Sequence, residues 1–251
     1  MKTVLALCWL LVGIHGLHAG WVVRGVDTLQ APAGIEFTRI QAVQEGQSAT
    51  VHVVSFHPKS HTLAVMDNPA GAFTLATASQ KRGVLAAVNG GYFHADRTPL
   101  GLVIRQGQEL HSLEKAKLLS GIVFASKSRV GLARVAEWKT STGITEALQA
   151  GPFLVDGGVP VAGLNGTRAA ARTVVFVDES GRCGLLVCQS TTLAETGALL
   201  ATRGISAHGK IVRALNLDGG SSTGLWVEGA LPYYLREGKE VRNYLGIVPR
   251  R

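Results

Sequence analysis

Short apolar runs separated by glycine-containing turns restrict the fold of this chain more than any other feature of its sequence. Apolar residues alternate or run together over residues 35–43, 50–56, 61–66, 84–88, 121–125, 152–155, 172–177, 184–188, 213–217, 225–228 and 241–248. Runs this short are typical of strands, because helices usually need about 10 residues or more. The 31 glycines show no collagen-like period and indicate many tight turns. The pattern therefore favours a β-rich fold over a helical bundle.

The composition suits one folded domain. A chain of 251 residues can bury a large core, and its 46% hydrophobic and 17% charged residues exclude a disordered chain. Residues 74–81 and 192–203 are predicted to be helical. The second helix begins with the capping box Thr192-x-x-Glu195, whereas Thr74-x-x-Thr77 lacks the acidic residue of that motif. We expect a single α+β domain with a mixed, largely antiparallel β-sheet and packed helices.

The N-terminus has the features of a signal peptide. Lys2 supplies a positive charge, residues 4–14 are almost wholly apolar, and Ala19 precedes a suitable cleavage point. The apolar run is shorter than the ~20 residues of a transmembrane helix. We therefore expect a signal peptide at 1–19, a domain at 20–251, and an exported protein, periplasmic or secreted, with no transmembrane segment. A buried N-terminal strand is the alternative interpretation.

Two cysteines follow the predicted signal peptide, and we expect no disulfide between them. Cys183 and Cys188 flank one predicted strand, on which their Cα atoms would lie ~16 Å apart and their side chains on opposite faces. A disulfide requires less than ~7 Å. No His or Cys partners occur at zinc-like spacing, so no metal site is predicted there.

The charge balance favours an anionic ligand. The formal net charge is +8 and the sequence pI is about 9.7, which suits an anionic cell-envelope glycan or a similar partner. The basic residues are scattered and no nucleic-acid-binding motif accompanies them, so nucleic acid is not an expected partner. The sequence predicts no particular oligomeric state.

The strongest candidate for a functional site lies where an apolar strand ends at Asp218. Gly219, Gly220, Ser221 and Ser222 follow directly. Glycines permit positive φ or close approach of the backbone to a ligand, and N–H groups and hydroxyls can bind anionic oxygens. The same pattern is also typical of a turn in which an aspartate caps its own loop.

A second candidate begins at Asn89, again at a strand end. Asn89 can donate and accept hydrogen bonds, and it precedes the glycine pair Gly90 and Gly91. Tyr92 and Phe93 can form a wall for a sugar ring. The alternative is an ordinary Asn-Gly turn beside core aromatics.

Two further segments place polar side chains next to predicted strands. Arg172 and Thr173 lead into an apolar strand, where an arginine is costly unless paired. The guanidinium suits phosphate or carboxylate, although a structural salt bridge explains it equally well. Gln149 begins a turn that leads into the next strand, and Asp156 is expected to cap the turn after that strand.

These segments, in this order, resemble the phosphodiester glycosidase family. The resemblance covers residues 83–248 and rests on Asn89-Gly90-Gly91-Tyr92-Phe93, Gln149-Ala150-Gly151-Pro152, Arg172-Thr173, Leu193-Ala194-Glu195, Asn216-Leu217-Asp218-Gly219-Gly220 and Val241-Arg242-Asn243. The chain departs from the family at Ser221, which replaces the third glycine of an Asp-Gly-Gly-Gly-Ser loop. A positive φ at that position would strain the serine.

The resemblance implies hydrolysis of the bond between a sugar anomeric carbon and a phosphodiester. Most glycosidases use two carboxylates, but phosphate leaves as a stable anion, so one carboxylate and a cationic anchor can suffice. We expect Asp218 to act as base or nucleophile, Arg172 to hold the phosphate, and Asn89 to orient sugar or oxygens. The expected substrate contacts are Gly90, Gly91, Tyr92, Thr173, Gly219, Gly220, Ser221, Ser222 and, more weakly, Arg242.

Glu195 is not placed in the site. It belongs to the family pattern, but the capping box with Thr192 is enough to account for an acidic residue at this position. No cofactor and no metal are expected, although Asp218 among hydroxyls could accept a calcium ion.

Three functions are compatible with these residues. The preferred one is an exported hydrolase of glycosyl phosphodiesters in cell-envelope or exopolysaccharide metabolism. A non-catalytic module that binds anionic polysaccharide is the first alternative. A metal-dependent phosphodiesterase is the second, although the sequence lacks the His/Asp clusters of a two-metal site.

Overall fold

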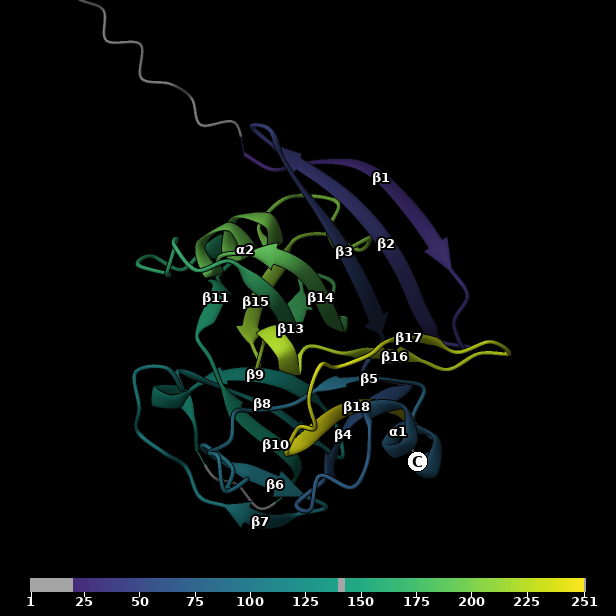
Figure 1. Cartoon of the computed structure of the whole chain (residues 1–251), viewed down its shortest axis with the longest axis vertical. Coiled ribbons are helices and arrows are strands. Elements are labelled where there is room, and N and C mark those ends of the chain that lie inside the picture. Colours follow the sequence, from purple (N-terminus) through teal and green to yellow (C-terminus); the bar gives the residue numbers. More distant parts are fainter. Residues whose placement is uncertain (1–19, 140–142, 251) are drawn as a thin grey trace, which may run out of the picture.

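Three antiparallel sheets make up the computed structural model, which describes residues 20–139 and 143–250 (Figure 1). The predicted signal peptide at 1–19 lies outside the described residues. Every strand pairing in the described part is antiparallel. The expected β-rich, largely antiparallel fold is therefore confirmed. The expected single mixed sheet is wrong, because there are three sheets and none of these pairings is parallel.

The largest sheet occupies the upper half of Figure 1. Its eight strands, in spatial order, are β1 (Val22–Leu29), β2 (Ile35–Gln44), β3 (Gln47–Phe56), β14 (Cys183–Thr191), β13 (Ala170–Asp178), β15 (Ile211–Asn216), β11 (Phe153–Asp156) and β12 (Val159–Pro160). The first three strands follow one another along the chain as a meander, and β14 pairs with β3 to attach them to the rest.

Two five-stranded sheets lie below it in the same view. One has the order β7 (Gln108–His111), β6 (Val103–Arg105), β10 (Ile144–Ala150), β8 (Gly121–Ser126) and β9 (Val130–Arg134). The other has the order β17 (Tyr233–Leu235), β16 (Leu225–Val227), β5 (Ala86–Asn89), β18 (Asn243–Pro249) and β4 (His61–Asp67).

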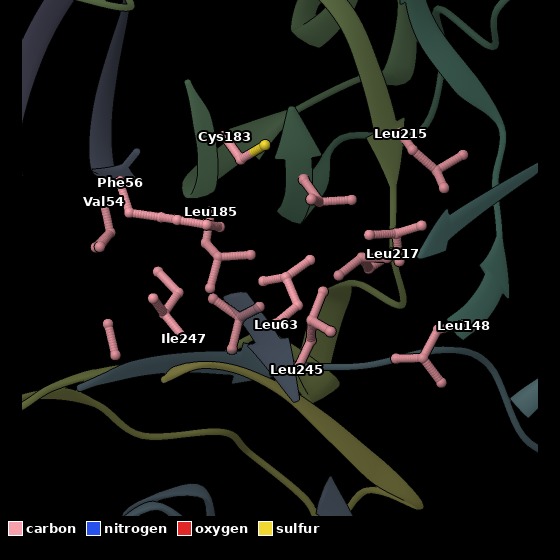
Figure 2. Close-up of a cluster of buried hydrophobic side chains, with 14 of the residues drawn as sticks. Val54, Phe56, Leu63, Leu148, Cys183, Leu185, Leu215, Leu217, Leu245 and Ile247 are labelled. Atoms are coloured by element: carbon pink, nitrogen blue, oxygen red, sulfur yellow. The ribbon is translucent and has the colours of Figure 1, made fainter. Parts of the chain in front are cut away.

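The main core lies where the three sheets meet (Figure 2). Val54 and Leu185 come from the large sheet, Leu148 from β10, and Leu63 and Leu245 from β4 and β18. All five are buried, so each sheet contributes an apolar face to the same interior. The continuous apolar runs in the sequence are explained by this arrangement, because central strands are covered on both faces.

Helices contribute less than the sequence analysis expected. In the described part of the chain, the α-helices are α1 (Leu75–Arg82) and α2 (Leu193–Leu200), with short 3-10 turns at Val135–Glu137 and Gly220–Ser222. Packed helices are thus a minor part of the fold. α2 ends three residues before the predicted limit of residue 203.

The N-terminus of α1 is capped without an acidic residue in the capping box. Thr77 replaces the missing acid of the capping box, since its hydroxyl accepts the N–H of Thr74 at 3.0 Å. The carboxylate comes from far along the chain, because Glu237 accepts the N–H of Leu75 at 2.6 Å. A buried carboxylate at a helix N-terminus is favourable through the helix dipole.

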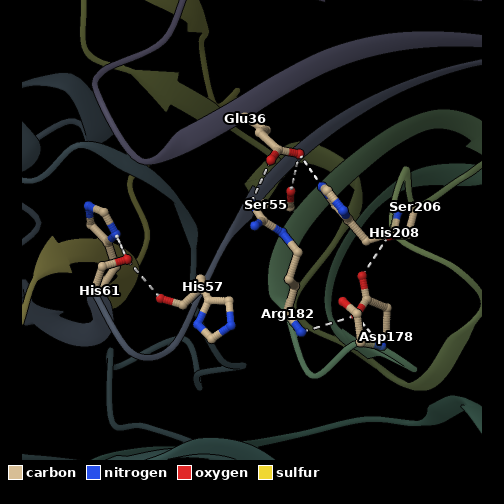
Figure 3. Close-up of polar contacts among 10 residues, drawn as sticks. Glu36, Ser55, His57, His61, Asp178, Arg182, Ser206 and His208 are labelled. Carbon is tan, nitrogen blue, oxygen red and sulfur yellow. Dashed lines mark hydrogen bonds and ion pairs between the residues drawn. The ribbon is translucent and has the colours of Figure 1, made fainter.

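The predicted hairpin between β13 and β14 is confirmed, and a polar network holds it (Figure 3). Asp178 is buried and accepts hydrogen bonds from the N–H of Arg182 at 3.0 Å and from the Ser206 hydroxyl at 2.7 Å. Arg182 and His208 both reach Glu36 on β2, at 2.8 and 2.7 Å. The network thereby ties the far end of β13 to the N-terminal meander.

Cys183 and Cys188 are free, as predicted, and belong to separate core clusters.

Asp156 pairs with two arginines and does not cap the expected turn. Its carboxylate forms ion pairs with Arg134 at 2.6 Å and Arg213 at 3.1 Å. The two cations, from β9 and β15, offer a stronger interaction than the turn amides do.

Gly184 provides a test of this packing. It pairs across the sheet with Phe176, whose ring covers it, and a Cβ at Gly184 would also lie 2.7 Å from the carbonyl oxygen of Val54. We expect Gly184→Ala to lower the free energy of unfolding by about 2 kcal/mol through overpacking. Gly25→Ala is the control, because nothing lies within 4 Å of that position. Urea unfolding of both variants measures the difference, and equal stabilities would contradict the packing described.

Candidate active site

A pocket of about 350 Å³ lies where β13 begins and β15 ends, and we call it the Asp218 pocket. It is lined by Tyr92, Leu118, Asn165, Arg168, Ala170, Arg172, Leu193, Asn216, Asp218, Gly219 and Gly220. Val174 on β13 pairs with Asn216 on β15, so the antiparallel register brings Arg172 and Asp218 to the same sheet end. Segments distant in sequence thus meet in one site.

Asp218 is half-buried and its backbone is fixed on two sides. Its N–H donates to the carbonyl of Gly90 at 3.1 Å, and its own carbonyl accepts from the Asn89 amide at 2.7 Å. Burial raises the pKa of the Asp218 carboxyl, and the Ser222 hydroxyl, the Gly219 N–H and the charge of Lys239 oppose that rise. The Gly219 N–H lies 2.9 Å from the carboxylate.

Asn89 is fully buried and does not line the Asp218 pocket. Besides its bond to Asp218, its side-chain oxygen accepts the Thr173 hydroxyl at 2.6 Å and the Gly224 N–H at 3.2 Å. Thr173 is buried in the same way. Asn89 and Thr173, both expected to contact substrate, therefore lie behind the pocket lining, where they position the loop that carries Asp218.

Gly90 and Gly91 are also buried behind the pocket, and their role is explained by Asn243. The Gly91 N–H donates to the Asn243 side-chain oxygen at 2.8 Å, and the Gly90 N–H donates to the Asn243 carbonyl at 2.9 Å. A Cβ on Gly90 would collide with that side-chain oxygen. Glycine is therefore required here by close approach between β5 and β18.

Arg172 faces the pocket from an irregular part of its strand. The β13–β14 register shifts between Ala170 and Arg172, and such bulges redirect side chains next to functional sites. The guanidinium donates to the carbonyls of Thr191 at 2.8 Å and Arg168 at 2.6 Å. Within the described residues it has no carboxylate partner, so a structural salt bridge does not explain this buried arginine.

Arg168 adds a second cation to the pocket that was not predicted from sequence. It is exposed on the loop before β13, and burial together with the charge of Arg168 lowers the pKa of Arg172. Asn165 lies on the same loop and accepts the N–H of Arg168 at 3.0 Å. This loop has neither apolar periodicity nor a motif, so the sequence held no local signal for these two residues.

Tyr92 lies on the wall of the pocket, as expected, but its hydroxyl is occupied. It donates to the carbonyl of Gly151 at 2.7 Å and accepts the Asn216 amide at 2.9 Å. Burial, with the charge of Asp218, raises the pKa of Tyr92 far above its usual value. The phenol is therefore neutral. The buried side-chain oxygen of Asn216 has no partner among the described residues, although this amide was given no role from sequence.

The glycine–serine loop is not strained by its departure from the family pattern. The left-handed position is Gly220, with φ of 60°, and Ser221 does not share it. A Cβ on Gly219 would lie 2.8 Å from the Ala171 carbonyl, so this glycine permits close approach to β13. Ser221 is exposed outside the Asp218 pocket. Ser222 is buried, and its hydroxyl interacts with the Asp218 carboxyl without reaching the geometry of a full hydrogen bond.

Three residues of the family pattern lie away from the lining. Arg242 forms an ion pair with Asp67 and does not line the pocket. Glu195 completes the predicted capping box, with its carboxylate 2.8 Å from the Thr192 N–H. Gln149 is buried, and its amide accepts from Leu102 and donates to Leu119 at 2.9 and 3.1 Å, which supports the loop that carries Leu118.

Metal ligands are scarce around this site. No group of three His, Cys, Asp or Glu side chains in the described residues is arranged to hold an ion. Asp218 is the one acidic residue among those lining the pocket, and Arg168 and Arg172 would repel a cation there.

Among the described residues, no helix combines the length and apolar character that crossing a bilayer requires.

Comparison with known proteins gives one family and several structures of similar fold. A family model for phosphodiester glycosidases matches residues 82–248. The Escherichia coli K12 protein YigE, which is uncharacterized, is 30% identical over 168 residues, which are 63% of this chain and 65% of that protein. The chain thus spans slightly less than two thirds of this curated relative.

The solved structures resemble this chain in fold at low sequence identity. The auto-inhibited catalytic domain of zebrafish N-acetylglucosamine-1-phosphodiester alpha-N-acetylglucosaminidase has a TM-score of 0.66 at 15% identity, covering 91% of this chain and 88% of that one. A Synechocystis protein has 0.62 at 19%, covering 89% and 64%. A Burkholderia pseudomallei K96243 protein that is thought to be exported has 0.64 at 12%, covering 92% and 97%.

The raised pKa of Asp218 predicts a gain in stability when its charge is removed. A pKa raised in the folded state gives stability that is present below the unfolded pKa of about 3.9 and is lost as pH rises through the folded value. At pH 7 the ionised carboxylate is therefore destabilising, and Asp218→Asn should melt at a higher temperature than the wild type. The difference should shrink as the pH falls towards 4.

Thermal unfolding between pH 4 and pH 7.5 measures this effect. Asp27→Asn is the control, because Asp27 is an exposed residue paired with Arg39 and its removal should give no gain. A lower melting temperature for Asp218→Asn at pH 7 would contradict the prediction, since the hydrogen bond from Gly219 would then outweigh burial.

Proposed function

Because the chain belongs to the phosphodiester glycosidase family, we propose that it hydrolyses the bond between the anomeric carbon of a sugar and a phosphodiester. The observation that carries this proposal is the meeting of Asp218 with Arg172 in one pocket, at a sheet end that two distant segments build. A carboxylate beside an arginine without a carboxylate partner suits a substrate with an electrophilic carbon next to an anion.

The charges of the pocket match a phosphodiester. Arg168 and Arg172 supply two positive charges and Asp218 one negative charge, which leaves a net charge of +1 among the lining residues. A phosphodiester has a charge of −1, so binding would neutralise the site. Arg172 can present its guanidinium in the planar geometry that phosphate oxygens accept, and its bonds to two carbonyls fix the orientation in advance.

Asp218 is proposed as the base or the nucleophile at the anomeric carbon. As a base, it takes a proton from water while the water oxygen bonds to that carbon, and the carbon–oxygen bond electrons leave with the phosphate. As a nucleophile, its carboxylate oxygen bonds to the anomeric carbon while the carbon–oxygen bond electrons leave with the phosphate. The oxygen of water then bonds to that carbon, the bond to Asp218 breaks with its electrons returning to the carboxylate, and a proton of the water passes to solvent. Both routes need an ionised Asp218, so activity should rise as pH increases through its elevated pKa.

Tyr92 and Leu118 are proposed to shape the sugar side of the site. The Tyr92 hydroxyl is held by Gly151 and Asn216, so the ring is fixed in place and offers a flat wall. Asn216 leaves a buried acceptor unused among the described residues, and a sugar hydroxyl could donate to it.

The setting of the reaction is a finer proposal. Export is supported by the signal-like N-terminus and by the fold similarity to the Burkholderia pseudomallei protein, which is thought to be exported. The net charge of +8 supports an anionic glycan of the cell envelope or an exopolysaccharide as substrate. The name of the zebrafish structure makes diesters of N-acetylglucosamine-1-phosphate the first compounds to test.

Hydrolysis in oxygen-18 water tests this function. The protein is incubated with a panel of sugar-1-phosphodiesters, with wild type beside Asp218→Asn. We expect the label in the released sugar and a loss of at least about 100-fold in kcat in the variant, in line with removal of a catalytic acid or base.

Other outcomes would identify the alternatives. Label in the phosphate would show cleavage of the phosphorus–oxygen bond and favour a phosphodiesterase. Tight binding of anionic glycans without turnover, unchanged in Asp218→Asn, would favour a binding module.

The second cation gives a separate prediction. Arg168 is exposed and its side chain has no partner among the described residues, so Arg168→Ala should leave stability unchanged. Loss of one charge-assisted contact to the diester should raise KM about tenfold. Arg203→Ala, an exposed arginine outside the pocket, is the control. Steady-state kinetics and thermal unfolding together check the result, and an unchanged KM would remove Arg168 from the anion site.

A further inference from the structure

A second pocket of about 310 Å³ meets the Asp218 pocket at Gly220, which lines both. We call it the Arg236 pocket. Ser221 and Thr223 continue its wall along the Asp218 loop, and Arg236 follows β17 on the opposite side. Its volume is within the range of small-molecule sites. A single residue of the loop, a glycine with φ of 60°, therefore lies between two cavities of similar size.

Three polar side chains of the Arg236 pocket are available to a ligand. Ser221, Gln189 and Arg236 are all exposed. In the described part of the chain, none of their side chains makes a hydrogen bond or an ion pair. They offer a hydroxyl, an amide and a guanidinium beside an apolar floor that includes Val187. Several donors around a small apolar surface suit a compound with many hydroxyl groups.

His52 forms a fixed wall of the same pocket. Its ring is buried, and Nε2 lies 2.8 Å from the Tyr233 hydroxyl. The rings of Phe37 and Tyr233 pack beside it, with the Tyr233 centroid 5.3 Å away. Burial lowers the pKa of His52, with a contribution from Arg39, so the imidazole is neutral at pH 7. The wall thus adds polarity without charge.

The backbone between the two pockets departs from regular strand geometry. Ser190, which directly follows Gln189, has a φ of 55°, a left-handed value that is rare outside glycine. Across the ladder, the register shifts between Ala170 and Arg172, and Arg172 lines one pocket while Ala171 lines the other. Such strained positions cluster at ligand sites.

From these observations we propose that the Arg236 pocket binds the alcohol that remains attached to the phosphate, and that this alcohol is a sugar or another polyol. The inference rests on the proposed function and extends it, since the protein would recognise both halves of its diester. Arg236 and Gln189 are then specificity-determining residues for the leaving half, and the sugar half occupies the Asp218 pocket.

Two diesters of one sugar-1-phosphate test the inference, one with a methyl group and one with a hexose beyond the phosphate. KM is measured for wild type, Arg236→Ala, Gln189→Ala and the control Arg24→Ala, whose arginine is exposed on β1. Dissociation constants of both diesters are measured in parallel with Asp218→Asn and with the double variant Asp218→Asn, Arg236→Ala.

We expect Arg236→Ala to raise KM for the hexose diester about tenfold and to leave KM for the methyl diester within about twofold, with the same contrast in the dissociation constants. Turnover of both diesters with equal effects, or with none, would overturn the subsite and leave the proposed function standing. If neither diester of any sugar in the panel is hydrolysed or bound, both proposals are wrong.

Discussion

The buried amide of Asn89 is the contact on which the site depends. It lies at the end of β5 and bonds to the main chain of Asp218, to the hydroxyl of Thr173 on β13 and to the N–H of Gly224. One side chain thereby joins a strand of the small sheet to two segments of the large sheet. Each bond satisfies a polar group in a buried or half-buried position, so losing the amide would weaken all three contacts together.

Two other buried side-chain amides also bond to the backbone near this contact. Asn243 bonds to the backbone of Gly91, and Gln149 donates to the carbonyls of Glu114 and Leu119, which lie on either side of Leu118. The amide of Asn89 and the ion pair between Arg134 on β9 and Asp156 on β11 each join one sheet to another, whereas Asn243 and Gln149 fix the backbone beside their own sheets. An amide can donate and accept without the desolvation cost of a charge, which suits a position beside an apolar core. The charged residues Arg168, Arg172 and Asp218 are left to face the pocket.

Much of the fold was predictable, because strand periodicity and turn residues agree along the chain. The convergence of Asp218 and Arg172 was expected from family motifs, and the antiparallel register of β13 and β15 explains it. The roles of Asn89, Gly90 and Gly91 were not predictable, since the sequence alone does not distinguish an asparagine that binds a ligand from one that binds the backbone. Arg168 could not be found, because its loop has no pattern. The ion pair of Arg242 with Asp67 was not predictable either, since the two residues are distant along the chain.

The choice of main-chain partners has a consequence for how this scaffold can change. Asn89 hydrogen-bonds to the carbonyl of residue 218 and to the N–H of residue 224, and neither bond depends on the side chain at those positions. The framework therefore imposes a path that favours glycine at 219 and 220 and leaves the side chains at 218 and 221 little constrained. Related sequences, or designed ones, can alter the reactive group and its neighbours while the same amides hold the backbone in register, so new specificities can arise here without rebuilding the fold.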